Sequence, residues 1–489
     1  MGKKDSATGD SVLTFTLFPD QAALMNDLRT AMRRNKAILL QAATGSGKTA
    51  MATDMIEKAA AKKKRCIFGV PRRNLMEQTS DTFREHGIDH SFIADGKPYH
   101  PHAMLYIGMT KTMDNRRKKG QLPSGINLFV PDETHFGDDA LGNVIAHYQS
   151  EGAYTVGLSA TPWKMNGQGL GVFGYKEMVC GKSIRWLIDN GRLCDYKLFG
   201  GKKRADFDGI RGKSDKQISE IMEGKREIIG DCVSEYIQRG MGKLWIVRCT
   251  SIKHSQMTAQ MFHDAGIPAA HVDGTQDEDT LKAIIMAYAR REILVLTFAD
   301  LLNFGFDLAQ SSGMDVCIEG CSDLKPSKSL AGELQFWGRV LRWKPFPAII
   351  NDHVNNHLEH GLPCAEREWT LDSKTSKQRG KGKVQATRQC PKCYAVHAPS
   401  ATCPACGHVY EIDSRSIKEV EGTLVEVDKN AVIIQKKEAR KEQGRTETLE
   451  DLIKLGRSKG YKNPVSWASY VWAGREKKRL TSAVKADSV

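Results

Sequence analysis

One stretch constrains the fold of this chain more than any other: residues 41–49, which read Gln-Ala-Ala-Thr-Gly-Ser-Gly-Lys-Thr. The apolar residues 37–40 before it are typical of a buried parallel strand, and residues 50–61 after it are good helix formers. A glycine-rich turn between a strand and a helix is the setting of a phosphate-binding loop. The sequence therefore predicts an α/β domain that binds phosphates at this turn. The alternative is a Gly/Ser turn that ends in Lys-Thr by chance.

The residues of this loop have predicted roles. Gly45 and Gly47 let backbone N–H groups turn toward a phosphate with no Cβ in the way. The N-terminus of the following helix adds partial positive charge. Lys48 can reach the β- and γ-phosphates, and the Thr49 hydroxyl can hold Mg²⁺. The strict pattern opens with Gly, where this chain has Ala42. The expected ATP-binding residues of the loop are Thr44, Gly45, Ser46, Gly47, Lys48 and Thr49.

A second candidate site follows the strand-like residues 126–130, where Pro131 precedes Asp132 and Glu133. Adjacent carboxylates at the C-terminal end of a parallel strand lie where such a sheet places its chemistry. Asp132 is suited to hold Mg²⁺ through water, and Glu133 to orient and deprotonate the attacking water. The pair alone is weak evidence. It gains value from the phosphate loop, which we expect one strand position away in the sheet.

Strands alternate with helices on both sides of residues 200–215, which are rich in Gly, Lys and Asp and indicate a link. Each alternating series predicts a parallel α/β unit. In the second series we expect strands at 244–248, 269–272, 293–297 and 314–318, and helices at 216–238, 252–265, 277–288 and 327–341. The last helix carries Gln335, Arg339 and Arg342 at i, i+4 and i+7, so they share one face. That set suits a phosphate chain.

These motifs occur in the order found in superfamily 2 helicases of the DEAD/DEAH type, which the chain resembles over about residues 15–345. It is most similar to the DNA-acting branch that includes type III restriction translocases and many phage-encoded helicases. The resembling stretches are 18–21, 42–49, 71–75, 132–135, 159–161, 303–307 and 335–342. Two departures are Pro131, where an aliphatic residue is usual, and Asn303, where a charged residue is common.

The resemblance implies two RecA-like domains with ATP in the cleft between them. It assigns Gln21 to adenine, which the amide of a glutamine could contact at two edge atoms. It assigns Lys48 and Thr49 to phosphates and Mg²⁺, and Asp132 and Glu133 to metal and water. The remaining implied roles are coupling for His135, Ser159 and Thr161, catalysis for Gln335, arginine fingers for Arg339 and Arg342, and ATP binding for Asp307.

Four of the twelve cysteines have ligand spacing: Cys390 and Cys393, then nine residues, then Cys403 and Cys406. Two such knuckles are typical of a zinc ribbon, which would hold a structural Zn²⁺. Two disulfides or four free thiols are the alternatives. Because the ribbon follows a basic linker, we expect it outside the motor, with substrate engagement as its task. His353 and His357, at i and i+4, would lie on one helix face and could form part of a metal site, but the sequence has no third ligand at a fixed spacing from them.

The charge balance favours an anionic partner, because the net charge is +14 and the sequence pI is about 9.1. The leading hypothesis is an ATP-dependent DNA helicase or translocase acting on single-stranded or branched DNA. RNA helicase, non-hydrolysing sensor or scaffold, and motor subunit of a restriction or defence complex stay open. Replication or recombination proteins are candidate partners, and no membrane is expected. We expect a cytoplasmic protein of a bacterial or phage-infected cell.

The expected fold class is thus α/β, with two RecA-like parallel-sheet domains, a small zinc ribbon and a helical C-terminal tail. Aromatic residues of the tail are either core or base-stacking platforms. The expected divisions are a disordered start (1–14), domain 1 (15–199), a link (200–215), domain 2 (216–372), a basic linker (373–388), the ribbon (389–411) and the tail (412–489).

Overall fold

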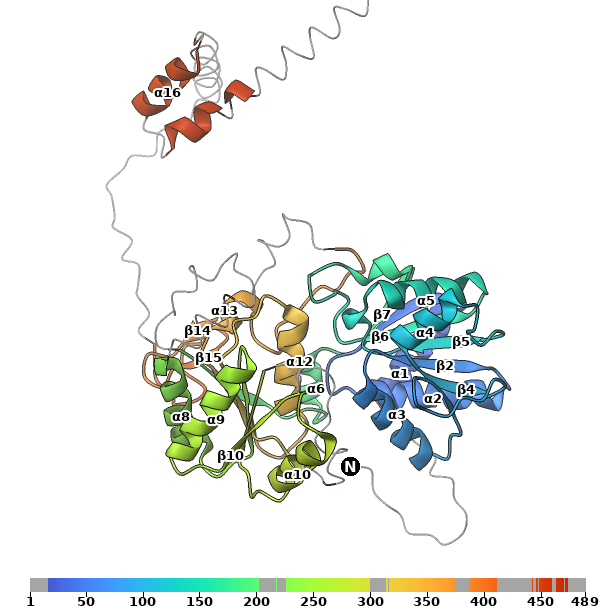
Figure 1. Cartoon of the computed structure of the whole chain (residues 1–489). Helices are drawn as coiled ribbons and strands as arrows, with labels where there is room; N and C mark the ends of the chain where they lie inside the picture. Colours follow the sequence, from blue (N-terminus) through green and yellow to red (C-terminus); the bar gives the residue numbers. More distant parts are fainter. Residues whose placement is uncertain are drawn as a thin grey trace, which may run out of the picture. The chain divides into compact units, whose positions relative to one another are not determined.

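The computed structural model describes residues 16–201, 217, 226–299, 314, 316–373, 387–410, 442, 446, 448–459, 463–469 and 471–473. The chain divides into two compact units, Met1–Tyr410 and Glu411–Val489 (Figure 1). Several expectations lie outside the described residues: the disordered start, most of both links, the stretch 303–307 with Asp307, and most of the tail. Within the described part of the chain, no helix is long and apolar enough to span a membrane.

The first unit contains a parallel sheet whose described strands run in the order β3-β4-β2-β5-β6-β1-β7. Every neighbouring pair is parallel. The strands are β1 (Ala37–Gln41), β2 (Cys66–Val70), β3 (Ser91–Ile93), β4 (Leu105–Met109), β5 (Leu128–Pro131), β6 (Tyr154–Ser159) and β7 (Glu177–Cys180). This first sheet confirms the predicted parallel α/β fold of the N-terminal half.

Helices cover both faces of the first sheet. Successive strand residues point to opposite sides, so each strand contributes apolar side chains to the core on either face. Ile38 and Leu40 of β1 pack in one core with side chains of α1, α2 and α3, whereas Leu39 packs in another with α4 and α5. A strand buried on both faces is a continuous apolar run. The helices of these two cores are α1 (Pro19–Met32), α2 (Lys48–Ala61), α3 (Arg73–Glu85), α4 (Thr110–Lys118) and α5 (Asp139–Ser150). Helix α6 (Ile184–Asp189) packs instead in a smaller cluster with Ala43 and Leu193.

A second sheet follows in the same unit, with described strands in the order β10-β11-β9-β12-β13-β8-β15-β14. The pairs from β10 to β8 are parallel, and the last two pairs are antiparallel. The strands are β8 (Tyr196–Gly200), β9 (Trp245–Arg248), β10 (Ala269–Val272), β11 (Val295–Phe298), β12 (Gly320–Asp323), β13 (Ala348–Asp352), β14 (Arg388–Gln389) and β15 (Ala395–His397). The helices are α8 (Arg226–Gly240), α9 (Ile252–Asp264), α10 (Glu278–Ala289), α12 (Leu330–Val340) and α13 (Asn356–His360).

One expected strand of the second series is wrong. The sequence predicts a strand at 314–318, but the ladder forms in β12, which begins at Gly320. Val316 and Ile318 are buried in the second core without strand pairing. A Cβ at residue 320 would lie 2.1 Å from the Trp245 ring, so only glycine lets β12 run this close to β9.

The cysteine-containing segment is part of the second sheet, which corrects the expectation of a ribbon outside the motor. Val396 of β15 pairs with Leu198 of β8, and Leu198 pairs with Ile350 of β13. Strand β8 itself belongs to this sheet, although the expected first domain ran to residue 199. Gln389 Nε2 donates to Gly200 O at 2.8 Å and fixes the same edge. The cysteines therefore close the edge of the second sheet.

The chain also returns from the second sheet to the first. We call residues 369–373 the return segment. The rings of Trp369 and Trp163 lie 5.0 Å apart, and Trp163 Nε1 donates to Asp372 O at 3.1 Å. The backbone N–H of Gly171 donates to Leu371 O at 3.0 Å. The return segment thus holds the loop that follows β6.

In the second unit, the described helix α16 (Leu449–Ser458) begins with a capping box formed by Thr448 and Asp451. Trp467 packs against this helix, because a Cβ at Gly456 would lie 3.1 Å from its ring. This contact favours the core interpretation for Trp467, one of the tail aromatics.

Candidate active site

The phosphate loop has the conformation that its glycines predict. Gly45 and Gly47 have φ of 81° and 84°, in the left-handed region that favours glycine. A Cβ at Gly47 would lie 2.3 Å from Gln21 Nε2, so this position also has no room for a side chain. Helix α2 begins at Lys48. The N–H groups of its first turn have no partner within the helix and are available to an anion.

Gln21 lies beside the phosphate loop. Its Nε2 donates to Ser46 O at 2.8 Å, and its Oε1 accepts from Phe18 N at 3.0 Å. The side chain is buried, and its contacts with Phe18 and Ser46 hold the amide in a single orientation. These protein contacts are enough to explain where Gln21 lies. Its contact with adenine stays a prediction.

The acidic pair follows β5, and β6 lies between β5 and β1. The expectation that the pair lies one strand position from the phosphate loop is therefore wrong by one strand. Asp132 N donates to Gly69 O at 2.8 Å, and its carboxylate accepts from Glu133 N at 2.8 Å. Glu133 has φ of 45°, which is unusual for a residue with a side chain. Such strain is typical of functional sites and costs about 1–3 kcal/mol.

The electrostatics of the pair favour a bound cation. Burial and the neighbouring Glu133 carboxylate raise the pKa of Asp132 to about 7, against the opposing effect of the Lys48 ammonium. Two carboxylates with one nearby ammonium leave an excess of negative charge that a divalent cation would neutralise. Carboxylate and hydroxyl oxygens suit Mg²⁺, so Asp132 and Thr49 fit this ion.

His135 connects the acidic pair to β6. Its Nδ1 lies 3.0 Å from Ser159 Oγ and 3.3 Å from Glu133 Oε2. Ser159 Oγ donates to Thr161 O at 2.6 Å, so its own proton is already used. His135 must therefore donate through Nδ1. Burial lowers the pKa of His135 to about 4, which leaves the ring neutral and Nε2 an acceptor.

Gln335 of α12 reaches this acceptor from the second sheet. Its Nε2 lies 2.7 Å from His135 Nε2 and 3.4 Å from Glu133 Oε2. The neutral Nδ1–H tautomer of His135 matches this contact, because Gln335 then donates to the ring lone pair. We call this set of contacts, Thr161–Ser159–His135–Gln335, the relay. It joins the loop after β6, the acidic pair and the helix that carries the arginines.

Helix α12 also touches the phosphate loop directly. A Cβ at Gly338 would lie 2.5 Å from Thr44, so the helix backbone and the loop are in close contact. Arg339 is half-buried on this helix, whereas Arg342 is exposed beyond the helix end, where its backbone forms a bridge with Leu193. The expected common helix face thus holds for Gln335 and Arg339 but not for Arg342. The contact of the two arginines with a phosphate stays a prediction.

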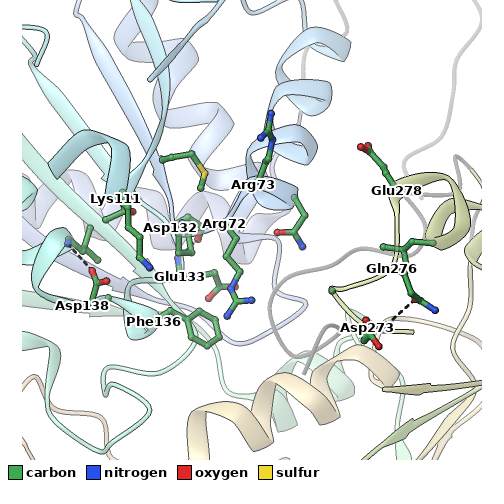
Figure 2. Close-up of a pocket in the computed structure, with 18 residues that line it drawn as sticks. Arg72, Arg73, Lys111, Asp132, Glu133, Phe136, Asp138, Asp273, Gln276 and Glu278 are labelled. Atoms are coloured by element: carbon green, nitrogen blue, oxygen red, sulfur yellow. Dashed lines mark hydrogen bonds between the residues drawn. The ribbon is translucent and has the colours of Figure 1, made fainter. Parts of the chain in front are cut away.

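A cavity of about 730 Å³ opens beside the acidic pair, between residues of the two sheets (Figure 2). One wall carries Arg72, Arg73 and Lys111, and the opposite wall carries Asp273 and Glu278. Arg72 and Arg73 belong to the resembling stretch 71–75, to which the sequence interpretation assigned no role, and Lys111, Asp273 and Glu278 were not singled out. Arg72 and Asp273 both follow parallel strands closely, and that position is a sequence signal that could have indicated them.

The four cysteines lie at one point. The Sγ atoms of Cys390 and Cys406 are 3.7 Å apart, as are those of Cys393 and Cys403, and all four lie within 4.8 Å of one another. Zn–S bonds of ~2.3 Å in a tetrahedron put sulfurs ~3.8 Å apart. These four cysteines form no disulfide. The thiols therefore fit a tetrahedral metal ion, and it is the one such cluster among the described residues.

The histidine interpretation gains no support. His357 Nδ1 contacts Asp352 Oδ2 at 2.8 Å, which occupies the ring nitrogen in a buried contact between strand end and helix. No metal cluster among the described residues includes His353 or His357.

Comparisons with known proteins show what the chain is similar to. Residues 14–164 match the family model described as type III restriction enzyme, res subunit. A 51.5 kDa protein of Lactococcus phage (isolate 7-9) is 30% identical over 399 residues, which cover 80% of this chain and 83% of the phage protein.

Two solved structures share the fold. A fragment of a putative HsdR subunit of a type I restriction enzyme from Vibrio vulnificus YJ016 has a TM-score of 0.54 at 17% identity, covering 70% of this chain and 65% of that one. The ATP-dependent type ISP restriction-modification enzyme LlaBIII, bound to DNA, has a TM-score of 0.50 at 16% identity. That likeness covers 70% of this chain but 28% of LlaBIII.

Proposed function

Because this chain belongs to the superfamily 2 helicases, in the branch of the type III restriction res subunits, we propose that it is an ATP-driven DNA helicase or translocase. Superfamily 2 helicases use ATP and Mg²⁺. The proposal is that this chain hydrolyses ATP beside α12 and uses the energy to move along or unwind single-stranded or branched DNA.

The relay is the observation that carries this proposal. It reaches from Thr161 through His135 to Gln335, and so connects the acidic pair on the first sheet with a helix of the second. A hydrolysis site divided between two sheets can sense the loss of a phosphate as a change in how the sheets contact each other. A protein that only bound nucleotide would not need this connection.

We assign the chemistry as follows. Lys48 and the N–H groups of the first turn of α2 bind the β- and γ-phosphates. Glu133 accepts a proton from the attacking water, and its strained backbone fixes the direction of its carboxylate. Arg339 and Arg342 stabilise negative charge that develops on the phosphate. Mg²⁺ held by Asp132 and Thr49 would supply charge neutralisation, and Gln335 holds the neutral tautomer of His135.

The choice of DNA rests on three observations. The chain has a net charge of +14. One wall of the cavity carries Arg72, Arg73 and Lys111, which suit a phosphate backbone. The branch to which the chain is similar contains DNA-acting enzymes, and LlaBIII is bound to DNA in its structure.

The test is ATP hydrolysis by the full chain with single-stranded DNA, duplex DNA, forked DNA or single-stranded RNA, each at two salt concentrations. Stimulation by DNA that weakens as salt rises is the expected result, because backbone phosphate contacts release counterions. Stimulation by RNA alone would favour the RNA helicase alternative. Turnover that no nucleic acid changes would contradict the proposal.

A second candidate is the motor subunit of a restriction or defence complex, which the res-subunit match at residues 14–164 favours. It predicts translocation on duplex DNA without strand separation. A triplex-displacement assay on duplex DNA, run beside a fork-unwinding assay, distinguishes the two functions. Replication or recombination proteins are the partners we propose for the helicase function, in the cytoplasm of a bacterial or phage-infected cell.

We further propose that Cys390, Cys393, Cys403 and Cys406 hold one Zn²⁺. Four thiolates leave no open position for water, so the ion is structural. Its place at the β15–β8 edge indicates that it stabilises the second sheet rather than an independent substrate-binding module. Elemental analysis of the purified chain should give about one equivalent of zinc, and its absence would refute the assignment.

A further inference from the structure

A buried ionic cluster lies under α12, away from the active site. Arg248 at the end of β9 and Asp323 at the end of β12 are paired across the ladder, and both are nearly inaccessible to solvent. Arg248 Nε donates to Asp323 Oδ1 at 2.9 Å, and its Nη2 donates to Asp323 Oδ2. The same Nη2 donates to Glu333 Oε2 of α12 at 2.5 Å. One guanidinium thus connects two central strands to the helix.

Two further contacts complete the cluster. Asn356 Nδ2 donates to Asp323 Oδ2 at 2.8 Å and lies 3.4 Å from Glu333 Oε2. The Arg248 guanidinium lies 4.3 Å from the centroid of the Phe336 ring, also on α12. Glu333 and Phe336 are three residues apart and share the inner face of the helix. The helix is therefore held to the sheet at two points by one arginine.

The cluster holds one guanidinium and two carboxyl groups. Burial raises the pKa of the Glu333 carboxyl well above its ordinary value, although Arg248 opposes this effect. The Arg248 guanidinium contacts both carboxyl groups, those of Asp323 and Glu333. Buried ion pairs of this kind contribute little net stability compared with apolar residues, but they fix geometry where a single arrangement is required.

The geometry of a helix explains what this arrangement controls. Residues advance by 100° each, so Glu333 and Gln335 project from opposite sides of α12. Gln335 contacts His135, and Gly338, one turn further on, packs against Thr44. The cluster therefore fixes, on the inner face, the rotation of the helix that sets the relay on the outer face. With a side-chain tip ~6 Å from the axis, a rotation of ~20° would move Gln335 by about 2 Å.

We propose that Arg248, acting with Asp323 and Glu333, is a positioning residue for ATP hydrolysis, because it holds α12 in the rotation that brings Gln335 to His135 and the arginines to the phosphate loop. Arg248 touches neither nucleotide nor reacting atoms. This inference rests on the proposed ATPase function. It predicts an effect on turnover without a comparable effect on nucleotide affinity.

The test variant is Arg248→Lys in the full chain. Lysine keeps the charge but lacks the fork that donates to the neighbouring strand and to the helix at once. A displacement of about 1 Å or more at a catalytic contact can cost 10²-fold, so we expect kcat to fall by about 10–100-fold while the KM for ATP changes by less than about threefold.

The matched control is Arg367→Lys. Arg367 is half-buried and donates to the carbonyls of His360, Leu362, Pro363 and Ala365, none of which lies on α12. It should lose a similar degree of thermal stability and keep its kcat. An equal loss of kcat in both variants would mean that Arg248 acts through general stability, which would overturn the proposal.

A second readout does not depend on turnover. Hydrogen–deuterium exchange followed by mass spectrometry reports on α12 directly, because backbone N–H groups exchange when a helix opens locally. Peptides from residues 330–340 should exchange about tenfold faster in Arg248→Lys than in the wild-type chain and should keep the wild-type rate in Arg367→Lys. Unchanged exchange in Arg248→Lys overturns the inference even if the wild-type chain proves to hydrolyse no ATP, an outcome that would instead remove the proposed function.

Discussion

The contact between Gly338 and Thr44 gives the sharpest test of how the two sheets form one active site. In Gly338→Ala, the added Cβ would lie 2.5 Å from both Cβ and Cγ2 of Thr44. Carbon atoms in ordinary contact are ~3.5–4.0 Å apart, so the helix and the loop must separate by about 1–1.5 Å. Both neighbours are held in place: Thr44 belongs to the phosphate loop, and α12 is tied to the second sheet through Glu333.

This displacement should appear in the rate. Misplacement by about 1 Å can cost 10²-fold, so we expect kcat for ATP to fall by about 10–100-fold in Gly338→Ala. Alanine is the better helix former by about 1 kcal/mol, so the loss would not reflect a weaker helix. The assay is steady-state phosphate release at saturating ATP and DNA, with thermal unfolding measured on the same samples.

The matched control is Gly332→Ala on the same helix. Its Cβ would lie 3.0 Å from the Met165 methyl, whose flexible side chain can move aside, and 3.8 Å from Ser329, which is an ordinary contact. This variant should keep kcat within about threefold, since a flexible contact costs little. Wild-type turnover in Gly338→Ala would refute the reasoning, because it would show that α12 does not need close contact with the phosphate loop during hydrolysis.

Four further predictions follow from the site. Lys48→Ala should weaken nucleotide binding and turnover together, whereas Glu133→Gln should keep ATP binding and lose turnover; unchanged turnover in Glu133→Gln would remove its role as the base. Arg339→Ala should leave ATP affinity nearly intact and lower kcat by ~10³-fold or more, and an unfolded variant would mark Arg339 as structural instead. Because the pKa of Asp132 is raised to about 7, protons should compete with Mg²⁺ and the apparent Mg²⁺ affinity should fall as pH drops through 7; a flat profile from pH 6 to 8 would contradict this. Cys403→Ser should lose the metal and lower both the melting temperature and basal ATP hydrolysis, because the cysteines close the edge of the second sheet. A metal-free variant with full basal hydrolysis would instead support a role for the ribbon outside the motor.

Local features of the site could be predicted from the sequence because they depend on neighbouring residues. The apolar run 37–40, the glycines of the loop and the helix formers after Lys48 each indicate the strand, turn and helix that the structure contains. The same holds for the spacing of Gln335 and Arg339 on α12. In each case the period of the element decides which side chains share a face.

The order of strands could not be predicted in this way. A parallel connection fixes the handedness of a crossover but not how many positions it spans, so the insertion of β6 between β5 and β1 has no local signal. Its consequence is functional, because β6 brings Ser159 between the acidic pair and the phosphate loop. The relay can form only with this order.

The cluster at Arg248 shows the limit of sequence interpretation most clearly. A lone arginine at the end of a strand gives no sign of burial, and Asp323 lies 75 residues further along the chain. Glu333, two residues before Gln335, looks like an ordinary helix-surface carboxylate in the sequence. Only the packing of α12 on β9 and β12 shows that the helix has a charged inner face and an outer face that contacts His135. The consequence is that the arginines and Gln335 cannot be evaluated as isolated motif residues, since their positions depend on a buried guanidinium on the other side of the same helix.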